Sequence, residues 1–265
     1  MLYGAMNFPV RPFLDELRIF SSLGFDYLEL AMDPPRAHYE TIRGHRDALL
    51  SSLEDLNMGL VCHLPTFLST ADLNHALRQA SLKEMLASLT VAADLRARKV
   101  VLHPSYITGL GVFVMDTARE YELESLEAIV QKADELGLQV CLENLFPQLR
   151  SRAEPDDFAE ILERFPTVQL TLDLGHANIG SKGAKRALEF IERFPDRIGH
   201  VHAGDNLGKR DDHLPIGVGN VQFPAVLKAL KGIGYDATVT FEVFAPDRDY
   251  LRVSREKFAA MLAAL

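Results

Sequence analysis

The sequence predicts a (β/α)8 barrel that forms a single domain over residues 1–265. Eight short apolar segments alternate with longer amphipathic segments, as expected when strands and helices alternate around a parallel sheet. No linker or change in composition interrupts this alternation, and about 250 residues is a common size for such a barrel. An open sheet of nine strands and a barrel of seven are the alternatives, since a strand count from one sequence can err by one.

The expected strands are largely apolar, which is typical of strands buried on both faces of a parallel sheet. They cover residues 2–8, 26–31, 59–64, 99–104, 138–144, 168–174, 197–203 and 237–244.

Helical patterns lie between these segments. They are clearest over residues 12–24, 125–137, 154–166, 223–234 and 249–265. Gly137, Pro166 and Gly232 are expected helix ends, because glycine and proline do not continue a helix well.

Composition excludes several classes of protein. The net charge of −9 argues against broad binding to nucleic acid or anionic lipid. The two cysteines, Cys62 and Cys141, are too few for a disulfide framework, which favours a reducing, cytoplasmic location. We find neither a signal peptide nor an apolar run of about 18 residues, so no membrane association is expected.

Acidic and histidine side chains recur at the ends of the expected strands. In this fold the active site lies at the carboxyl ends of the strands, so these side chains should converge. Several buried carboxylates would repel one another unless cations were present. Histidine and carboxylate ligands suit zinc or manganese, and the sequence therefore predicts a site for divalent metal. The residues in question come from the third to the eighth expected strand and the segments after them, and are His63, His103, Glu143, Asp173, His176, His202, Asp211, His213 and Glu242. The second expected strand also carries an acidic residue, Glu29.

The remaining histidines receive other interpretations. His38, His45 and His75 lie on helix-like segments and are expected to be solvated. His200 shares the strand parity of His202 but lies one layer deeper, so we expect it to support the site or fill the barrel.

Five motifs resemble those of the xylose isomerase-like barrels, a superfamily of sugar phosphate isomerases and epimerases that also includes endonuclease IV. They occur in the same order over nearly the whole chain. They are LEN at 142–144, LDLGHAN at 172–178, HVHAGDN at 200–206, DDHLPIGVGN at 211–220 and FEVF at 241–244.

The resemblance implies roles for nine residues. Glu143, Asp173, His202 and Glu242 match the four ligands of the metal ion that the isomerases and epimerases share. In those enzymes the two glutamates, here Glu143 and Glu242, also transfer protons. The endonuclease IV branch adds two ions. His63 and His103 match the ligands that join Glu143 on one of them, and His176, Asp211 and His213 match the ligands of the other.

The segment between His202 and Gly219 contains two of these nine ligands. Asp211 and His213 are two residues apart and could hold one ion, or else form a hydrogen-bonded clamp without metal. Pro215, Gly217 and Gly219 are expected to shape the turn that follows. The neighbouring acids Asp205 and Asp212 are expected to face solvent or support the ligands.

The first functional hypothesis is an isomerase or epimerase that acts on a small sugar, sugar phosphate or polyol with one to three divalent ions. Asn144 and Phe146 could line a small pocket. A phosphate group would need cations, for which the candidates are Lys182, Lys185, Arg186, Lys209, Arg210 and Arg248; ordinary surface charges are the alternative reading.

The second hypothesis is an abasic-site endonuclease with three zinc ions, and only this hypothesis implies a nucleic-acid partner. The segment Pro34-Pro35-Arg36 with Arg43 and Arg46 could contact DNA, or could be a solvated helix face. The acidic net charge and the lack of a basic stripe weigh against this hypothesis. A metal-binding barrel without catalysis is the third hypothesis, and the intact pair Glu143 and Glu242 disfavours it.

Overall fold

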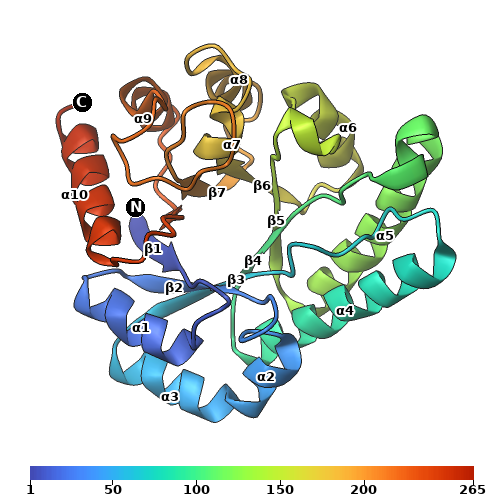
Figure 1. Cartoon of the computed structure of the whole chain (residues 1–265), viewed down its shortest axis with the longest axis horizontal. Helices are drawn as coiled ribbons and strands as arrows, with labels where there is room; N and C mark the ends of the chain where they lie inside the picture. The colour runs from blue at the N-terminus through green and yellow to red at the C-terminus, as the bar shows by residue number, and fades with distance from the viewer.

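The computed structural model describes residues 1–265 and contains eight parallel strands that close into a barrel in sequence order (Figure 1). This confirms the predicted (β/α)8 barrel. The strands are β1 (Leu2–Met6), β2 (Tyr27–Ala31), β3 (Gly59–His63), β4 (Lys99–Leu102), β5 (Gln139–Glu143), β6 (Gln169–Asp173), β7 (Ile198–Ala203) and β8 (Thr238–Phe241).

Helices surround the barrel and cover the outer face of the strands (Figure 1). They are α1 (Phe13–Ser22), α2 (Tyr39–Gly44), α3 (Arg46–Asp55), α4 (His75–Asp94), α5 (Met115–Leu136), α6 (Pro155–Arg164), α7 (Leu174–Asn178), α8 (Lys185–Arg193), α9 (Phe223–Gly232) and α10 (Asp249–Ala263). Short 3-10 turns, η1 (Gly109–Phe113) and η2 (Pro147–Leu149), follow β4 and β5. None of the helices combines the length and the apolar character needed to cross a bilayer.

Local sequence explains the boundaries of these helices. Pro155 opens α6, where the side chains of Glu154 and Asp157 form a capping box with the first backbone N–H groups. Gly137 ends α5 with a φ of 68°, a left-handed conformation that glycine adopts without steric cost. These ends set the point at which the chain turns into the next strand.

The main core lies between the strands and the helices. It is one cluster of 57 buried apolar residues, with Phe20, Phe158, Phe190 and Phe258 among the largest. All five residues of β2, YLELA, are buried, which agrees with strands covered on both faces. The strand scaffold is therefore closely packed on the outside, and polar side chains can point only into the barrel or out of its ends.

Strand register brings the polar strand ends to one level. Asp173 on β6 pairs with His202 on β7, and His202 pairs with Thr240 on β8. The predicted bounds of the fourth and eighth strands were too long, since β4 ends at Leu102 and β8 ends at Phe241. His103 and Glu242 thus lie one residue beyond their strands, where side chains reach the mouth of the barrel.

Candidate functional site

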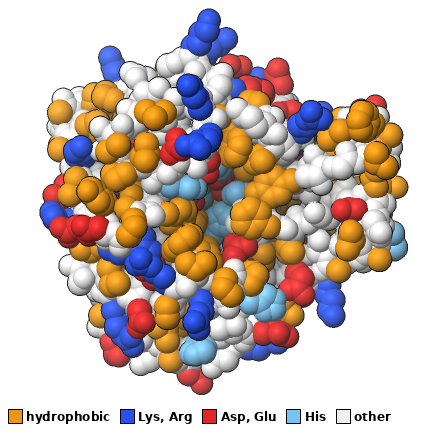
Figure 2. Space-filling view, viewed as in Figure 1, with side chains coloured by type: hydrophobic (Ala, Val, Ile, Leu, Met, Phe, Trp, Pro, Cys, Tyr) orange, Lys and Arg blue, Asp and Glu red, His pale blue; other side chains and the backbone are white.

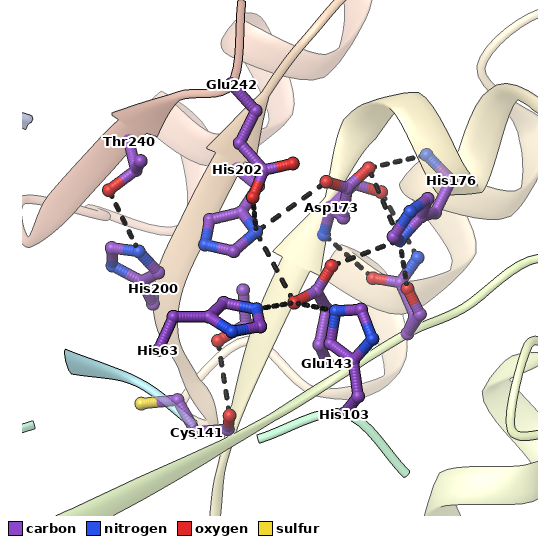
Figure 3. Close-up of polar contacts among 12 residues, drawn as sticks. His63, His103, Cys141, Glu143, Asp173, His176, His200, His202, Thr240 and Glu242 are labelled. Atoms are coloured by element: carbon purple, nitrogen blue, oxygen red, sulfur yellow. Dashed lines mark hydrogen bonds and ion pairs between the residues drawn. The ribbon is translucent and has the colours of Figure 1, made fainter. Parts of the chain in front are cut away.

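The nine predicted ligand residues form one continuous cluster at the carboxyl ends of the strands. Figure 3 labels all of them except Asp211 and His213. The side chains converge from β3, β5, β6 and β7 and from the segments just after β4, β6, β7 and β8. In the space-filling view, histidine and acidic side chains line a hollow at the centre of this face, and apolar side chains surround it (Figure 2).

Glu143 occupies the centre of the cluster and is completely buried. Its Oε2 lies 3.1 Å from His103 Nε2, 3.5 Å from His63 Nε2 and 3.4 Å from His202 Nδ1. Its Oε1 lies 3.1 Å from His176 Nδ1. One carboxylate therefore contacts four histidines, as expected for a residue that bridges neighbouring ions.

Asp173 and Glu242 complete the inner part of the cluster beside His202. The Nδ1 atom of His202 lies 3.7 Å from an oxygen of Asp173 and 3.1 Å from an oxygen of Glu242. The second oxygen of Glu242 lies 3.5 Å from His213 Nδ1, which links the inner residues to the outer ones.

The outer part consists of His176, Asp211 and His213. An oxygen of Asp211 lies 3.2 Å from His176 Nε2 and 2.9 Å from His213 Nε2. His213 has a φ of 46°, a left-handed conformation that is uncommon for a residue with a β-carbon. Strained backbone of this kind persists where surrounding contacts hold it, and it often occurs at functional sites.

Asp205 holds the loop that carries these outer residues. The residue is only 1% exposed, so of the two roles expected for it, the structure agrees with the supporting role and not with the solvent-facing one. Its carboxylate accepts hydrogen bonds from the backbone N–H groups of Gly217, Gly219 and Val221 at 2.8–3.1 Å. Asp212, by contrast, is partly exposed and pairs with Arg210.

The cluster contains buried polar atoms without hydrogen-bond partners. Both carboxylate oxygens of Glu143 and Nδ1 of His202 are buried, and none has a partner with hydrogen-bond geometry. Such atoms are costly to bury without partners, and a bound ion is a common partner for them. The nitrogen and carboxylate donors around them suit zinc or manganese, so the residues fit a divalent metal.

The histidines are oriented for metal binding through their second nitrogen atoms. His63 Nδ1 lies 2.8 Å from the carbonyl oxygen of Leu64, and His176 Nδ1 lies 2.9 Å from that of Asn144. His103 Nδ1 lies 2.9 Å from the hydroxyl of Tyr106. These contacts engage Nδ1 of each ring. The Nε2 atoms of His63 and His103 then face Glu143, and Nε2 of His176 faces Asp211. Such fixation of one ring nitrogen is typical of metal-binding histidines.

Burial and neighbouring charges shift the pKa values of the cluster. Burial raises the pKa of Asp173 to about 7, and Glu242 and Glu143 add to the effect. Burial would also raise the pKa of Glu143, but His103 and His202 hold it well below its usual range. Burial alone would lower the pKa of His63, but the neighbouring carboxylate of Glu143 outweighs burial and raises this pKa to about 9. In the protein without metal, the carboxylates and histidines thus act as each other's counter-charges.

Asn144 connects two strand ends rather than lining an open pocket. Its side-chain oxygen accepts from the backbone N–H of Asp173 at 2.8 Å, and its amide donates to the carbonyl of Asp173 at 3.1 Å. Phe146 does lie beside the cluster, with its ring centroid 5.1 Å from that of His176. His200 is completely buried below His202, with ring centroids 4.9 Å apart.

Two of the predicted phosphate-binding cations are buried and already form ion pairs. Arg186 pairs with Glu154 at 2.7 Å and donates to the carbonyl oxygens of Ala177 and Ile179. Arg248 is 8% exposed and pairs with Glu16, which is 1% exposed. These contacts do not support their prediction as phosphate ligands, while Lys182, Lys185, Lys209 and Arg210 are exposed.

The other basic and histidine side chains named from the sequence lie outside the cluster. His45 and His75 are exposed, and His38 is half-buried and lies 2.9 Å from Glu84. Arg36 and Arg43 are exposed, and the half-buried Arg46 binds Asp47 and the carbonyl of Asp94.

Glu29 is a residue whose role the sequence did not reveal. It lies within β2, is completely buried and contacts both His200 and His202. The available signal was a single acidic residue in the apolar segment YLELA, since an unpaired carboxylate in such a strand would be costly.

Comparison with known proteins agrees with the cluster and the fold. The family model described as "Xylose isomerase-like TIM barrel" matches residues 17–263. The chain belongs to this family.

Among curated relatives, "Uncharacterized protein MJ1311" of Methanocaldococcus jannaschii is 33% identical over 217 residues, which cover 76% of this chain and 72% of that protein. "L-ribulose-5-phosphate 3-epimerase UlaE" of Salmonella typhi is 25% identical over 247 residues, which cover 88% of this chain and 82% of that enzyme. A solved structure described as a "D-tagatose 3-epimerase-like protein" is 28% identical and superposes with a TM-score of 0.87, over 100% of this chain and 98% of the other. The chain is therefore similar to sugar epimerases over most of its length.

Proposed function

We propose that this protein is a metal-dependent isomerase or epimerase of a small sugar or polyol. The observation that carries the proposal is that Glu143, at the end of β5, and Glu242, just after β8, approach the same histidine nitrogen, His202 Nδ1, at 3.4 and 3.1 Å. Two carboxylates that flank one binding position can act on opposite faces of a substrate bound there. Similarity to epimerases over most of the chain supports the same reaction class.

In the proposed reaction, one of the two glutamates removes a proton from a carbon beside a carbonyl group. The other glutamate delivers a proton to the opposite face of that carbon, which inverts its configuration. Glu143, Asp173, His202 and Glu242 would hold the principal ion, and His63, His103, His176, Asp211 and His213 would hold up to two more. A bound divalent ion would polarise the substrate oxygens and favour loss of the proton.

Unphosphorylated sugars are the preferred substrates in this proposal. Arg186 is buried and already binds Glu154 and two backbone carbonyls, and Arg248 is buried against Glu16, so neither is free to bind a phosphate group. The hollow at the mouth is bordered by apolar side chains, as a space-filling view shows (Figure 2). A neutral ring or chain with an apolar face fits this border better than a charged phosphate does.

The test is proton exchange in heavy water with a panel of ketoses, in the presence of zinc or manganese. We expect the wild type to exchange and epimerise one carbon, whereas Glu143→Gln and Glu242→Gln should abolish epimerisation. The exposed Glu163 on α6 supplies the matched control, Glu163→Gln, which should retain full activity. If the metal-loaded wild type neither exchanges nor epimerises any ketose, the proposal is wrong.

Phosphodiester hydrolysis is the second candidate function, because the cluster contains ligands for three ions and clustered metals suit in-line displacement. Nicking of plasmid DNA that carries abasic sites, with His176→Ala and His213→Ala as severe as Glu143→Gln, would favour it over epimerisation. An intact plasmid at high protein concentration would exclude it.

A further inference from the structure

Two histidines of β7 share one buried carboxylate on the inner side of the cluster. Glu29 Oε1 lies 3.0 Å from His202 Nε2, and Glu29 Oε2 lies 2.9 Å from His200 Nε2. All three side chains are completely buried. The contact spans the barrel interior, since β2 and β7 are not neighbours in the sheet.

In the network around Glu29, the direction of each hydrogen bond follows from which atoms can donate. The hydroxyl of Tyr27 lies 2.7 Å from that of Thr240, which donates to Glu29. On the other side, Lys99 Nζ donates to Thr238 Oγ1 at 2.7 Å, and Thr238 Oγ1 lies 2.6 Å from His200 Nδ1. Because an ionised carboxylate only accepts hydrogen bonds, both histidines must carry a proton on Nε2.

This orientation decides which nitrogen of His202 faces the cluster. With the proton on Nε2, the lone pair of the neutral ring is on Nδ1. Nδ1 is the buried atom without a hydrogen-bond partner, beside Glu143, Asp173 and Glu242. We propose that Glu29 is a positioning residue that holds His202 in its Nε2–H tautomer and thereby sets the affinity of the cluster for its metal ion.

The same three residues could instead hold an ion themselves, since Glu29, His200 and His202 bring suitable ligand atoms close together. Their facing atoms, however, already pair with one another. The unpaired atoms lie on the opposite side of the His202 ring. An ion is expected where buried ligand atoms lack partners, which is at His202 Nδ1. Glu29 therefore binds the far nitrogen of the metal ligand His202 and is not itself a ligand.

Glu29 also differs from the partners of the other ligand histidines. His63 has a neutral backbone carbonyl as the partner of its second nitrogen, and His103 has the neutral hydroxyl of Tyr106. His202 has a carboxylate, which increases the basicity of the ring and strengthens its bond to a metal. The proposal rests on the metal centre proposed above, but it concerns a residue outside the ligand set.

The informative substitution is Glu29→Gln, which keeps the shape but replaces one oxygen with an NH2 group. Two groups, His200 and Thr240, donate to Oε2, whereas His202 alone donates to Oε1. The amide oxygen will take the position with two donors, so the NH2 group will face His202 Nε2. This forces the proton of a neutral His202 onto Nδ1, where it blocks metal binding.

The first measurement is the zinc dissociation constant, obtained by competition with a chelator. We expect affinity for the tightest ion to fall about 10- to 100-fold in Glu29→Gln, the range found when partners of ligand histidines are lost. The control is Glu16→Gln, because Glu16 is an equally buried carboxylate in the ion pair with Arg248 on the outer side of the barrel. Equal affinities of a folded Glu29→Gln and the wild type would overturn the proposal.

The second measurement uses the wild type alone and does not depend on the folding of a variant. Nitrogen-15 spectra of the zinc-loaded protein with labelled histidine should show His202 bound to zinc through Nδ1 and protonated on Nε2. Zinc bound through Nε2 of His202 would overturn the proposal while leaving a metal centre in place. If the wild type binds no zinc or manganese, the proposed metal centre fails together with the role of Glu29.

Discussion

Arg248→Met is expected to destabilise the protein strongly without acting on the binding of a phosphate group. Arg248 Nε lies 3.1 Å from Glu16 Oε1, and the second contact of the pair joins Nη2 to Glu16 Oε2. Methionine removes the buried cation and leaves Glu16, which is 1% exposed, with only the partly exposed Arg11 at 3.7 Å and the backbone N–H of Phe8 as partners. Breaking a buried ion pair from one side costs about 3–5 kcal/mol. At roughly 2–4 °C per kcal/mol for a chain of this size, the melting temperature should fall by about 6–20 °C.

Thermal unfolding followed by circular dichroism measures this effect at neutral pH. Arg252→Met on α10 is the matched control, since Arg252 forms partly exposed ion pairs with Asp249 and Glu256, and exposed pairs of this kind contribute little to stability. Its melting temperature should stay close to that of the wild type. A melting temperature of Arg248→Met within about 3 °C of the wild type would refute the reasoning. So would an unchanged melting temperature with selective loss of activity on phosphorylated sugars.

Two further predictions concern the loop after β7 and the metal itself. In Gly219→Ala, the new β-carbon would lie closer than 3.0 Å to Asn206 O and Asp205 Oδ1. The loop with Asp211 and His213 must then shift, and elemental analysis should find fewer zinc ions per chain than in the wild type; an unchanged count would contradict this. Removal of metal with a chelator should lower the melting temperature reversibly. Free metal at 100 times its dissociation constant stabilises by about 2.7 kcal/mol, or roughly 5–11 °C, and a melting temperature insensitive to both chelator and added zinc would count against a bound ion.

The sequence was sufficient to predict the barrel because each strand is a distinct apolar segment. YLELA and QVCLE are buried along their length, and such segments are visible without any knowledge of their neighbours. The strand ends were less accurate. Polar residues such as His103 and Glu242 continue the direction of a strand into the mouth, and no local feature separates the last paired residue from the next.

The candidate site was predictable as a set of ligand-type residues, because the fold places all strand ends at one rim. Its supporting contacts were not predictable. The hydrogen bond between Glu29 and His202 joins residues that are 173 positions apart in the chain. The hydrogen bonds that Asp205 accepts depend on how the loop after β7 returns to the barrel. Whether Arg248 contacts solvent or Glu16 also depends on tertiary packing, which the composition of a segment does not show.

The carboxylate of Asp205 has a consequence for how this site can change over time. It holds the loop after β7 through backbone N–H groups, which every residue except proline provides. Asp211 and His213 contribute none of these bonds, so their side chains can be replaced while the loop keeps its path. Under the proposed metal centre, substitution at these two positions would change how many ions the barrel can hold, without a new architecture for the rim.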